Sequence, residues 1–563
     1  MILRKLTDTL SVSPQIAATD LPALHAAGIR AIVCNRPDGE SRDQPAVAEI
    51  RAAAAPFGID VHYLPIAAGH VTAEQAAQFG VLVASLDAPV LAYCRSGTRS
   101  ATLWTLSESG GPASPGASAT AAGTGDSADA RTAGIAQADS QPLPAVDARH
   151  DVVIVGAGAA GIAVASSLLA RDASLDVAVI DPAEFHYYQP GWTMVGAGVF
   201  RPESTERAMA DVLPRGVRRI RAAVARFEPD AHAVVLEHGR RIGYRKLVVC
   251  AGLELDWHAI DGLVDTLGRH GVTSNYRYDL APYTWELVRA FCGGRALFTQ
   301  PPMPIKCAGA PQKAMYLSCD HWRRTGRLAA ANVEFLNAGG ALFGVADYVP
   351  ALMEYVKRYG IALSFGHNLV AIDGPARRAT FVRTLPDGGT QTVERAFDMI
   401  HVVPPQKAPG FVRASPLADA AGWIDVDPAT LRHKRFADIF ALGDVTNTTN
   451  AKTAAAARKQ APVVAHNVLA SLGRAHGDAA YDGYGSCPLT VERGRIVLAE
   501  FLYGGKLAPT FPAWLIDGKR PSRLAWLLKA RILPPLYWNA MLKGREWLAK
   551  PAIRAAGAER SAG

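Results

Sequence analysis

Val152-Val-Ile-Val-Gly-Ala-Gly-Ala-Ala-Gly161 is the stretch of this 563-residue chain that decides its fold. The apolar run predicts a buried parallel strand, the glycines allow a tight turn, and residues 162–169 predict the helix that follows. A second predicted strand, 176–180, ends at Asp181, where an acidic side chain can bind a ribose. The order strand, glycine loop, helix, strand and acid predicts a Rossmann-type α/β domain that binds a dinucleotide through Gly156, Gly158, Gly161 and Asp181.

A second motif indicates which dinucleotide is bound. Residues 437–444, Ala-Asp-Ile-Phe-Ala-Leu-Gly-Asp, predict an apolar strand that ends in Gly-Asp. The stretch resembles the second FAD motif of glutathione-reductase-like flavoproteins, in which the Asp lies beside the ribityl chain. The pair of motifs therefore predicts FAD and a tandem Rossmann-type architecture.

A nucleotide loop is missing further along the chain. Residues 300–309, Gln-Pro-Pro-Met-Pro-Ile-Lys-Cys-Ala-Gly, follow a predicted strand at 295–299, where a second glycine loop would form. Prolines have no N–H to offer a phosphate, and Cys307 supplies a thiol instead. Residues 332–337 also end without an acidic ribose ligand. NADH would therefore lack both of its usual contacts, and we expect electrons to leave to a quinone.

Composition limits the classes of protein to consider. A net charge of +8 and a pI near 9.1 come without a dense Lys/Arg run, so nucleic acid is not an expected partner. The N-terminus lacks the pattern of a secretory signal, and no apolar run is long enough to span a bilayer. Seven cysteines, an odd and sparse set, argue against a structural disulfide framework, and no ligand spacing predicts a metal site. We expect a cytoplasmic address.

The composition along the chain divides it into five parts. Residues 1–106 predict a small α/β domain, with strands at 28–34 and 90–94 and a helix at 72–86 capped by Thr72. Residues 107–148 are rich in Gly, Ala and Ser and predict a disordered linker with an r.m.s. span on the order of 35 Å. Residues 149–480 form the predicted flavoprotein, 481–550 a C-terminal region, and 551–563 a flexible tail.

The C-terminal region favours a membrane surface. Residues 524–543 mix apolar and aromatic bulk with Lys and Arg and are interrupted by Pro534 and Pro535. Such a segment is suited to the bilayer interface, with its basic residues toward anionic headgroups. We therefore expect a peripheral protein on the inner face of the cell membrane. The alternative is a docking segment that packs on its own core or in a homo-oligomer.

Several strings point to one family. They are His186-Tyr-Tyr-Gln-Pro-Gly-Trp-Thr-Met-Val-Gly-Ala-Gly198, Lys306-Cys-Ala-Gly-Ala-Pro-Gln-Lys313, Asp444-Val-Thr-Asn447, Ala451-Lys-Thr-Ala-Ala-Ala456 and Tyr481-Asp-Gly-Tyr-Gly-Ser-Cys-Pro-Leu489. Together they resemble the sulfide:quinone oxidoreductases, in the branch that includes the mitochondrial enzymes. The resemblance implies a redox pair, Cys307 and Cys487, beside a non-covalent FAD. It also implies a set of FAD contacts: Gly156, Gly158, Ala159, Gly161, Asp181, Gln189, Val224, Asp444 and Lys452.

Sulfur chemistry agrees with this resemblance. Hydrosulfide can attack a disulfide between Cys307 and Cys487 and leave a persulfide and a thiolate, from which two electrons pass to FAD. Lys306 and Lys313 would favour the thiolate, although Lys313 could equally be a solvated lysine early in a helix. The sulfur acceptor would be a small thiol, sulfite or Cys94, and the electron acceptor a ubiquinone-type quinone.

The N-terminal domain carries a cysteine loop of its own. Tyr93-Cys94-Arg-Ser-Gly-Thr-Arg99-Ser100 follows one predicted strand and precedes a helix, which makes an anion cradle that favours a Cys94 thiolate. The Cys-x4-Arg spacing is that of rhodanese sulfurtransferases, one residue shorter than the phosphatase loop. The domain resembles small phosphatase-like domains that are joined to persulfide-handling hydrolases.

Several functions remain open at this stage. For the N-terminal domain they are persulfide transfer through Cys94 and Arg99, a phosphatase with Asp38 as general acid, and a degenerate structural domain. For the whole chain the alternatives to sulfide oxidation are an NADH:quinone oxidoreductase of the same fold and a non-catalytic redox sensor or membrane adaptor.

Overall fold

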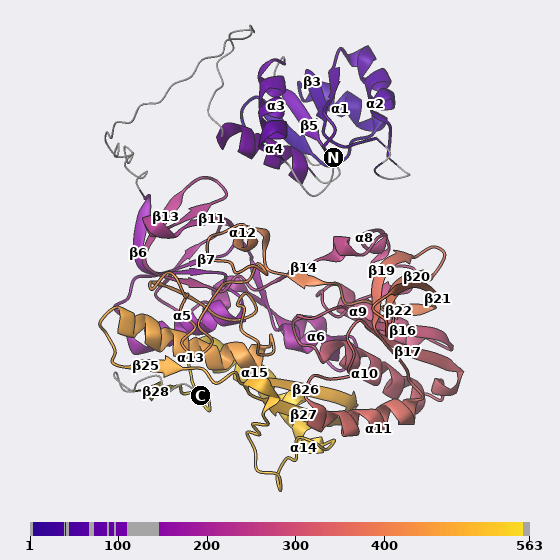
Figure 1. The fold of residues 1–563 in the computed structure, drawn as a ribbon, viewed down its shortest axis with the longest axis vertical. Helices are drawn as coiled ribbons and strands as arrows, with labels where there is room; N and C mark the ends of the chain where they lie inside the picture. Colours follow the sequence, from indigo (N-terminus) through magenta and orange to yellow (C-terminus); the bar gives the residue numbers. More distant parts are fainter. Residues whose placement is uncertain are drawn as a thin grey trace, which may run out of the picture. The chain divides into compact units, whose positions relative to one another are not determined.

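A computed structural model describes residues 4–38, 40, 44–66, 72–86, 89–94, 97–109 and 146–554 (Figure 1). The chain divides into two compact units, residues 1–137 and 138–563. Most of the predicted linker, 110–145, and most of the predicted tail, 555–563, lie outside the described residues.

The N-terminal unit is a three-layer α/β domain. Its sheet has the order β1-β2-β5-β3-β4, with bounds Arg4–Lys5, Leu10–Ser13, Val90–Tyr93, Ala31–Cys34 and Asp60–Tyr63. Helices α1 (Leu21–Ala26) and α2 (Val47–Ala54) cover one face, and α3 (Ala73–Ala84) and α4 (Thr98–Ser109) cover the other. The predicted strands and the helix cap are confirmed, since the Thr72 hydroxyl accepts a hydrogen bond from the Gln75 N–H at 3.2 Å.

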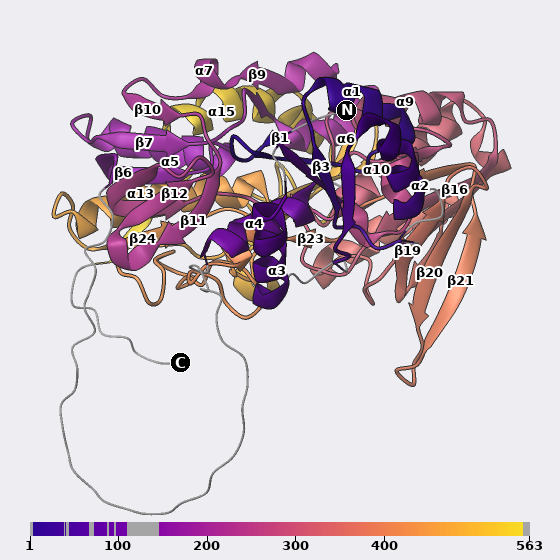
Figure 2. The ribbon, with the colours of Figure 1, turned by 90° about the horizontal axis from the view of Figure 1, so that it is seen from above.

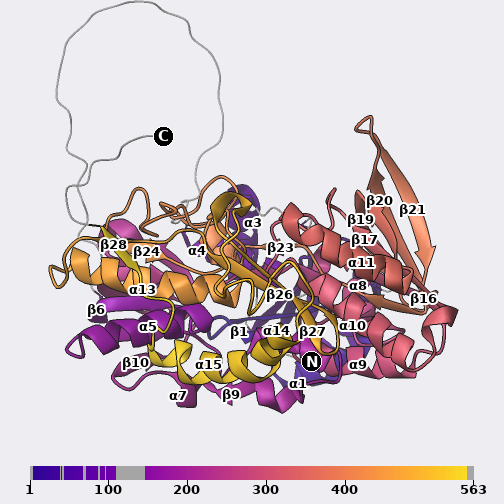
Figure 3. The same ribbon diagram turned by 90° about the horizontal axis from the view of Figure 1, so that it is seen from below.

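The second unit begins with the sheet that the first glycine motif predicts. Its order is β10-β7-β6-β13-β12-β11, and β24 pairs with β13. The bounds are β6 Ala148–Val155, β7 Val177–Ile180, β10 Val217–Ile220, β11 Val224–Glu228, β12 Ala233–Leu236, β13 Arg241–Val249 and β24 Ile439–Ala441. Helices α5 (Ala159–Arg171) and α13 (Ala454–Ser471) pack side by side (Figure 3).

A second Rossmann-like half follows. Its parallel sheet has the order β15-β22-β16-β17-β18, with bounds Val272–Thr273, Met399–His401, Gly294–Gln300, Ala331–Asn337 and Ala362–Phe365. Helices α9 (Leu280–Ala290), α10 (Ala310–Arg324) and α11 (Val349–Tyr359) belong to this half. A three-stranded antiparallel sheet, β19 (His367–Asp373), β20 (Arg378–Thr384) and β21 (Thr390–Ala396), projects from it (Figure 2). The predicted tandem α/β architecture is confirmed.

The C-terminal region packs back on both halves. The hairpin of β26 (Gly485–Glu492) and β27 (Arg495–Phe501) lies on α10, so that Cys487 joins the core of the second half. Beyond it come α14 (Arg523–Leu527), one π-helical turn (Leu528–Ile532) and α15 (Leu533–Asn539). Within the described part of the chain, every helix is too short or too polar to cross a bilayer.

Candidate functional site

The first glycine loop makes a cradle for a pyrophosphate. Gly156 has φ +99°, and a Cβ there would meet the Cys250 carbonyl oxygen at 2.5 Å, so only glycine fits. A Cβ on Gly161 would overlap the Gly156 carbonyl oxygen. Gly158 faces open space at the start of α5, where no side chain caps the helix. Backbone N–H groups at the N-terminus of α5, including that of Ala159, are thus available to an anion.

Asp181 stands at the end of β7, where the sequence places it. Its carboxylate accepts hydrogen bonds from the Ala157 N–H at 2.6 Å and from the Ala183 N–H at 2.7 Å. These contacts hold the side chain against the glycine loop. The remaining lone pairs of the carboxylate can accept ribose hydroxyls.

The second motif meets the first through the sheet. Strand β24 runs parallel to β13, which in turn pairs with β6. The chain then turns at Gly443, where a Cβ would come within 3.1 Å of the Ala160 Cβ in α5. Asp444 follows directly, and burial raises the pKa of its carboxyl. The two predicted FAD motifs therefore converge at one end of α5.

A run of contacts joins the two FAD motifs to the cysteine loop. The Lys306 ammonium donates to Gln189 Oε1 at 2.5 Å. The Cys307 N–H donates to the Lys452 carbonyl oxygen at 2.8 Å, and the Lys452 ammonium donates to the Asp444 carbonyl oxygen at 2.7 Å. The glycine cradle, Asp181 and the polar side chains of Gln189 and Lys452 fit FAD. Through Lys452, the loop that carries Cys307 is connected to Asp444 of the second motif. Val224 opens β11 in the same sheet, and its contact with FAD stays a prediction.

The structure brings together two sulfur atoms from residues 180 positions apart. Cys307 Sγ and Cys487 Sγ lie 4.0 Å from each other, and both are free thiols in this structure. Cys487 lies on β26, which packs against α10. Cys307 lies in the loop that precedes α10 in the sequence and has a strained φ of +51°. Tyr276, which the sequence did not single out, donates its hydroxyl to the Lys306 carbonyl oxygen at 3.0 Å and steadies the loop.

Lys313 polarises the pair. Its ammonium lies 3.0 Å from Cys307 Sγ, and its side chain is only 2% exposed, so the solvated-lysine alternative is wrong. The hydrogen bond from Cys487 and the Lys313 charge hold the pKa of the Cys307 thiol well below its ordinary value, although burial opposes them. The same hydrogen bond and burial raise the pKa of the Cys487 thiol. Cys307 is therefore the better thiolate.

A second buried lysine was not anticipated. Lys529 comes from the π-helical turn, donates to the Pro190 carbonyl oxygen at 2.9 Å and is 2% exposed. Burial and the nearby Lys313 charge lower its pKa to about 8, and its charge acts on both cysteines. The composition of residues 524–543 predicts basic side chains that face headgroups, and for Lys529 that prediction is wrong. The apolar neighbours of Lys529 in the sequence, Leu528 and Ala530, were the signal from which its burial could have been predicted.

In the N-terminal unit, Arg99 is tied down by three partners. Its guanidinium donates to the carbonyl oxygens of Asn35 at 3.1 Å and Ile66 at 2.6 Å, and to Glu40 Oε1 at 2.7 Å. Arg36 donates to the other Glu40 oxygen at 2.8 Å. Burial opposes ionisation, but these two hydrogen bonds hold the pKa of Glu40 below its ordinary value. Glu40 was not predicted.

The two other residues predicted for this unit are Cys94 and Asp38. Cys94 is buried at the end of β5, and loop residues 95 and 96 lie outside the described part of the chain. Asp38 accepts a hydrogen bond from the Val47 N–H at 2.9 Å, so its carboxylate caps α2.

Comparisons with known proteins agree with both units. Residues 2–111 match the family model "Beta-lactamase hydrolase-like protein, phosphatase-like domain", and residues 150–288 match "Pyridine nucleotide-disulphide oxidoreductase". Over 104 residues the chain is 33% identical to the beta-lactamase hydrolase-like protein of Agrobacterium fabrum, which is 18% of this chain and 24% of that protein. In fold, it is similar to the sulfide:quinone oxidoreductase structure from Aquifex aeolicus, with a TM-score of 0.58 and 18% identity over 70% of this chain and 92% of that one.

Relatives cover the flavoprotein part almost entirely. The mitochondrial sulfide:quinone oxidoreductase of Mus musculus is 38% identical over 395 residues, which is 70% of this chain and 87% of the mouse protein. That of Dictyostelium discoideum is 40% identical over 405 residues, 71% of this chain and 88% of its own length. On this identity and coverage, together with the geometry of the FAD motifs, the chain belongs to the sulfide:quinone oxidoreductase family and carries a phosphatase-like domain ahead of the flavoprotein.

Proposed function

We propose that this chain oxidises sulfide to sulfane sulfur at Cys307 and Cys487 and passes the electrons through FAD to a ubiquinone-type quinone. The observation that carries the proposal is the pair of sulfur atoms 4.0 Å apart with the Lys313 ammonium 3.0 Å from one of them. The backbone hydrogen bond from Cys307 to Lys452 attaches this pair to the second FAD motif.

The position of Lys313 supports different roles for the two cysteines. In the oxidised pair, hydrosulfide attacks the Cys487 sulfur, a sulfur–sulfur bond to sulfide forms, and the Cys307–Cys487 bond breaks. The electron pair of the broken bond stays on Cys307 as a thiolate, which Lys313 stabilises. Cys487 is left as the persulfide. A low-pKa thiol is the better leaving group, which is the reason for this order of events.

The cycle closes by transfer of the sulfane sulfur. A thiolate acceptor RS⁻ takes that sulfur and becomes RSS⁻, which frees Cys487; sulfite would accept it in the same way. Renewed bonding between Cys307 and Cys487 releases two electrons. FAD, which the glycine loop, Asp181 and Asp444 would hold, would supply the two-electron redox chemistry between the cysteine pair and the quinone. Overall, HS⁻ and RS⁻ become RSS⁻ and one proton, and the quinone gains two electrons and two protons.

The C-terminal segment supports a peripheral position on a membrane surface, which we propose to be the inner face of the cell membrane. Leu524, Leu527 and Ile532 are 47%, 49% and 48% exposed, and Trp514 in the preceding loop is 84% exposed. Large exposed apolar side chains close together are typical of an interfacial segment. A quinone dissolved in the bilayer would then be within reach of the flavin half.

For the N-terminal unit, sulfur transfer through Cys94 is better supported than phosphatase activity. A phosphatase needs a protonated carboxyl group to give the leaving group a proton. Glu40 is held ionised between Arg36 and Arg99, and Asp38 caps α2. A Cys94 thiolate that accepts sulfane sulfur from a persulfide needs no such acid.

Anaerobic stopped-flow mixing tests the main proposal. With sulfite present as the sulfur acceptor, sulfide should bleach the flavin of the wild type but not of Cys307→Ser, and NADH should bleach neither. Cys292→Ser, at an exposed cysteine, is the matched control and should behave as the wild type. Bleaching by NADH without bleaching by sulfide would establish the NADH:quinone alternative instead. For the N-terminal unit, Cys94→Ser should leave flavin bleaching intact and change the distribution of sulfur products.

A further inference from the structure

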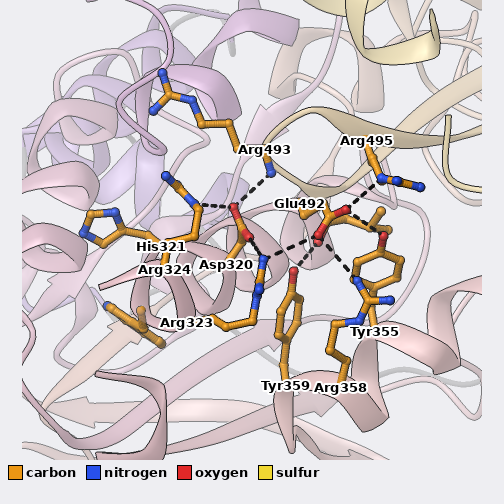
Figure 4. A network of polar contacts seen from close by, with 12 residues as sticks. Asp320, His321, Arg323, Arg324, Tyr355, Arg358, Tyr359, Glu492, Arg493 and Arg495 are labelled. Atoms are coloured by element: carbon orange, nitrogen blue, oxygen red, sulfur yellow. Dashed lines mark hydrogen bonds and ion pairs between the residues drawn. The ribbon is translucent and has the colours of Figure 1, made fainter. Parts of the chain in front are cut away.

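Five arginines surround two carboxylates where the β26–β27 turn meets the ends of α10 and α11 (Figure 4). We name these residues the arginine cluster: Arg323, Arg324, Arg358, Arg493 and Arg495. Asp320 accepts hydrogen bonds from Arg324 Nε at 3.0 Å and from the Arg493 N–H at 3.0 Å. Glu492 pairs with Arg495 Nε at 3.1 Å and with Arg358 at 3.5 Å.

The cluster presents positive charge outward. Four guanidinium groups pair with the two carboxylates. Arg493 adds a fifth positive charge, so the cluster has an excess of three positive charges. The Asp320 and Glu492 side chains are 2% and 13% exposed, whereas four of the arginine side chains are 42–46% exposed. Arg493 is exposed, and its guanidinium points away from both carboxylates (Figure 4). The buried acids therefore organise the arginines without neutralising the surface.

This charged surface adjoins the exposed apolar helix. Strand β27 begins at Arg495, and the next residue, Ile496, forms a β-bridge with Ser522. The Ser522 hydroxyl caps α14 by accepting from the Ala525 N–H at 3.3 Å. Helix α14 then exposes Leu524 and Leu527. Figure 3 shows α14 and β27 in front on the same side of the second unit.

We propose that the arginine cluster binds the phosphate groups of anionic phospholipids while the apolar side chains of α14 enter the bilayer interface. This inference rests on the membrane association proposed above and adds the lipid group that the protein recognises. Guanidinium groups bind phosphate oxygens in pairs, and each basic residue near an anionic surface strengthens membrane binding. The adjoining apolar side chains favour a lipid surface over an acidic protein as the occupant.

Vesicle flotation with the full-length holoprotein tests the proposal. One set of vesicles contains phosphatidylcholine alone, and in the other phosphatidylglycerol replaces part of it. The wild type should bind the anionic vesicles more tightly, and rising salt should reduce the difference. The double variant Arg493→Glu, Arg495→Glu should lose at least about tenfold in binding to anionic vesicles and little to neutral ones. Arg383→Glu, at an exposed arginine on β20, is the control and should keep the preference.

The outcomes separate this proposal from the catalytic one. Equal binding to both vesicle types, or an unchanged preference in the Arg493→Glu, Arg495→Glu variant, would overturn lipid recognition and make the cluster an internal ion-pair network or a protein contact. The flavin spectrum and its bleaching by sulfide without vesicles report on folding and catalysis independently. Charge-dependent vesicle binding without bleaching by sulfide would leave the surface standing and remove the proposed reaction.

Discussion

Lys313 is the single side chain on which the reactivity of the sulfur pair depends most directly. Its ammonium lies 3.0 Å from Cys307 Sγ. The hydrogen bond from Cys487 and this ammonium together lower the pKa of that thiol. A thiol with a lowered pKa is a thiolate above that pKa and becomes protonated as the pH falls through it. Lys313→Met removes the charge, so the pKa of Cys307 should rise by about one unit or more.

Two measurements check this change. The pH at which alkylation of the reduced enzyme is half-maximal should move to higher pH in Lys313→Met. Flavin reduction by sulfide should slow about threefold for each unit of increase in the pKa of the leaving thiol. Lys357→Met, at an exposed lysine on α11, should change neither quantity. An unchanged alkylation profile in Lys313→Met would show that Lys313 serves the fold alone.

For single residues, the sequence predicted which side chains take part in the reaction but not how deeply they are buried. Cys307, Cys487 and the FAD residues could be named because motifs carry their identities. The burial of Lys313 could not, because a lysine in the first turn of a helix is usually solvated. Its burial depends on tertiary contacts, among them the packing of β26 on α10. Glu40 escaped notice for the same reason, since its arginine partner Arg99 lies 59 residues away.

Among the elements, the segment from α14 to α15 packs on the protein's own core with one side, as one of the two alternatives predicted, while its role at a membrane interface stays a prediction. Its outer side exposes Leu524, Leu527 and Ile532, as an interfacial helix would. On its inner side, the Lys529 ammonium donates to the Pro190 carbonyl oxygen. Tyr537 Oη lies 2.6 Å from His186 Nε2, beside the glycine loop. The mixed apolar, aromatic and basic composition of residues 524–543 predicted exposed apolar side chains. The partners of the inner side belong to chain segments more than 300 residues away, so the local sequence of this segment could not predict them.

Lys529 makes this segment less stable than it could be. Burial and the Lys313 charge lower its pKa from 10.5 to about 8, so the fold disfavours the ammonium form. Below pH 8 the lysine is protonated in both the folded and the unfolded state, and the full destabilisation is present. Between pH 8 and 10.5 only the unfolded state holds the proton, so the cost fades as the pH rises.

Lys529→Met should therefore raise the free energy of unfolding by up to about 3 kcal/mol at pH 7, less what the lost hydrogen bond to Pro190 takes away. The gain in melting temperature should shrink as the pH rises from 8 toward 10.5. The same variant should reduce its flavin more slowly with sulfide, because a positive charge beside the cysteines is gone. Thermal unfolding followed by circular dichroism, with Lys519→Met as an exposed control, measures the first effect. A pH-independent gain would contradict the account.

On the scale of the whole molecule, each of the two units carries cysteines that the sequence predicts to be reactive, Cys94 in one and Cys307 with Cys487 in the other. The sequence predicted both folds, since strand–loop–helix order and glycine spacing are local signals. It also predicts a flexible linker at 107–148, whose composition supplies no apolar surface to pack. If Cys94 takes sulfur from the flavoprotein unit of its own chain, that linker sets the rate at which the two sites meet.

A mixing experiment tests whether the tether matters. Tethering gives Cys94 an effective concentration of about the millimolar range if the linker can span the two sites, far above the concentration of dilute enzyme. In the wild type, the share of sulfur product that depends on Cys94 should not change on dilution. In an equimolar mixture of Cys94→Ser and Cys307→Ser chains, the sulfur must pass between molecules, so that share should fall as the mixture is diluted. Light scattering at each concentration identifies exchange within an oligomer. If the mixture matches the wild type at every dilution while the chains remain monomeric, a freely diffusing persulfide carries the sulfur and the fusion adds no relay.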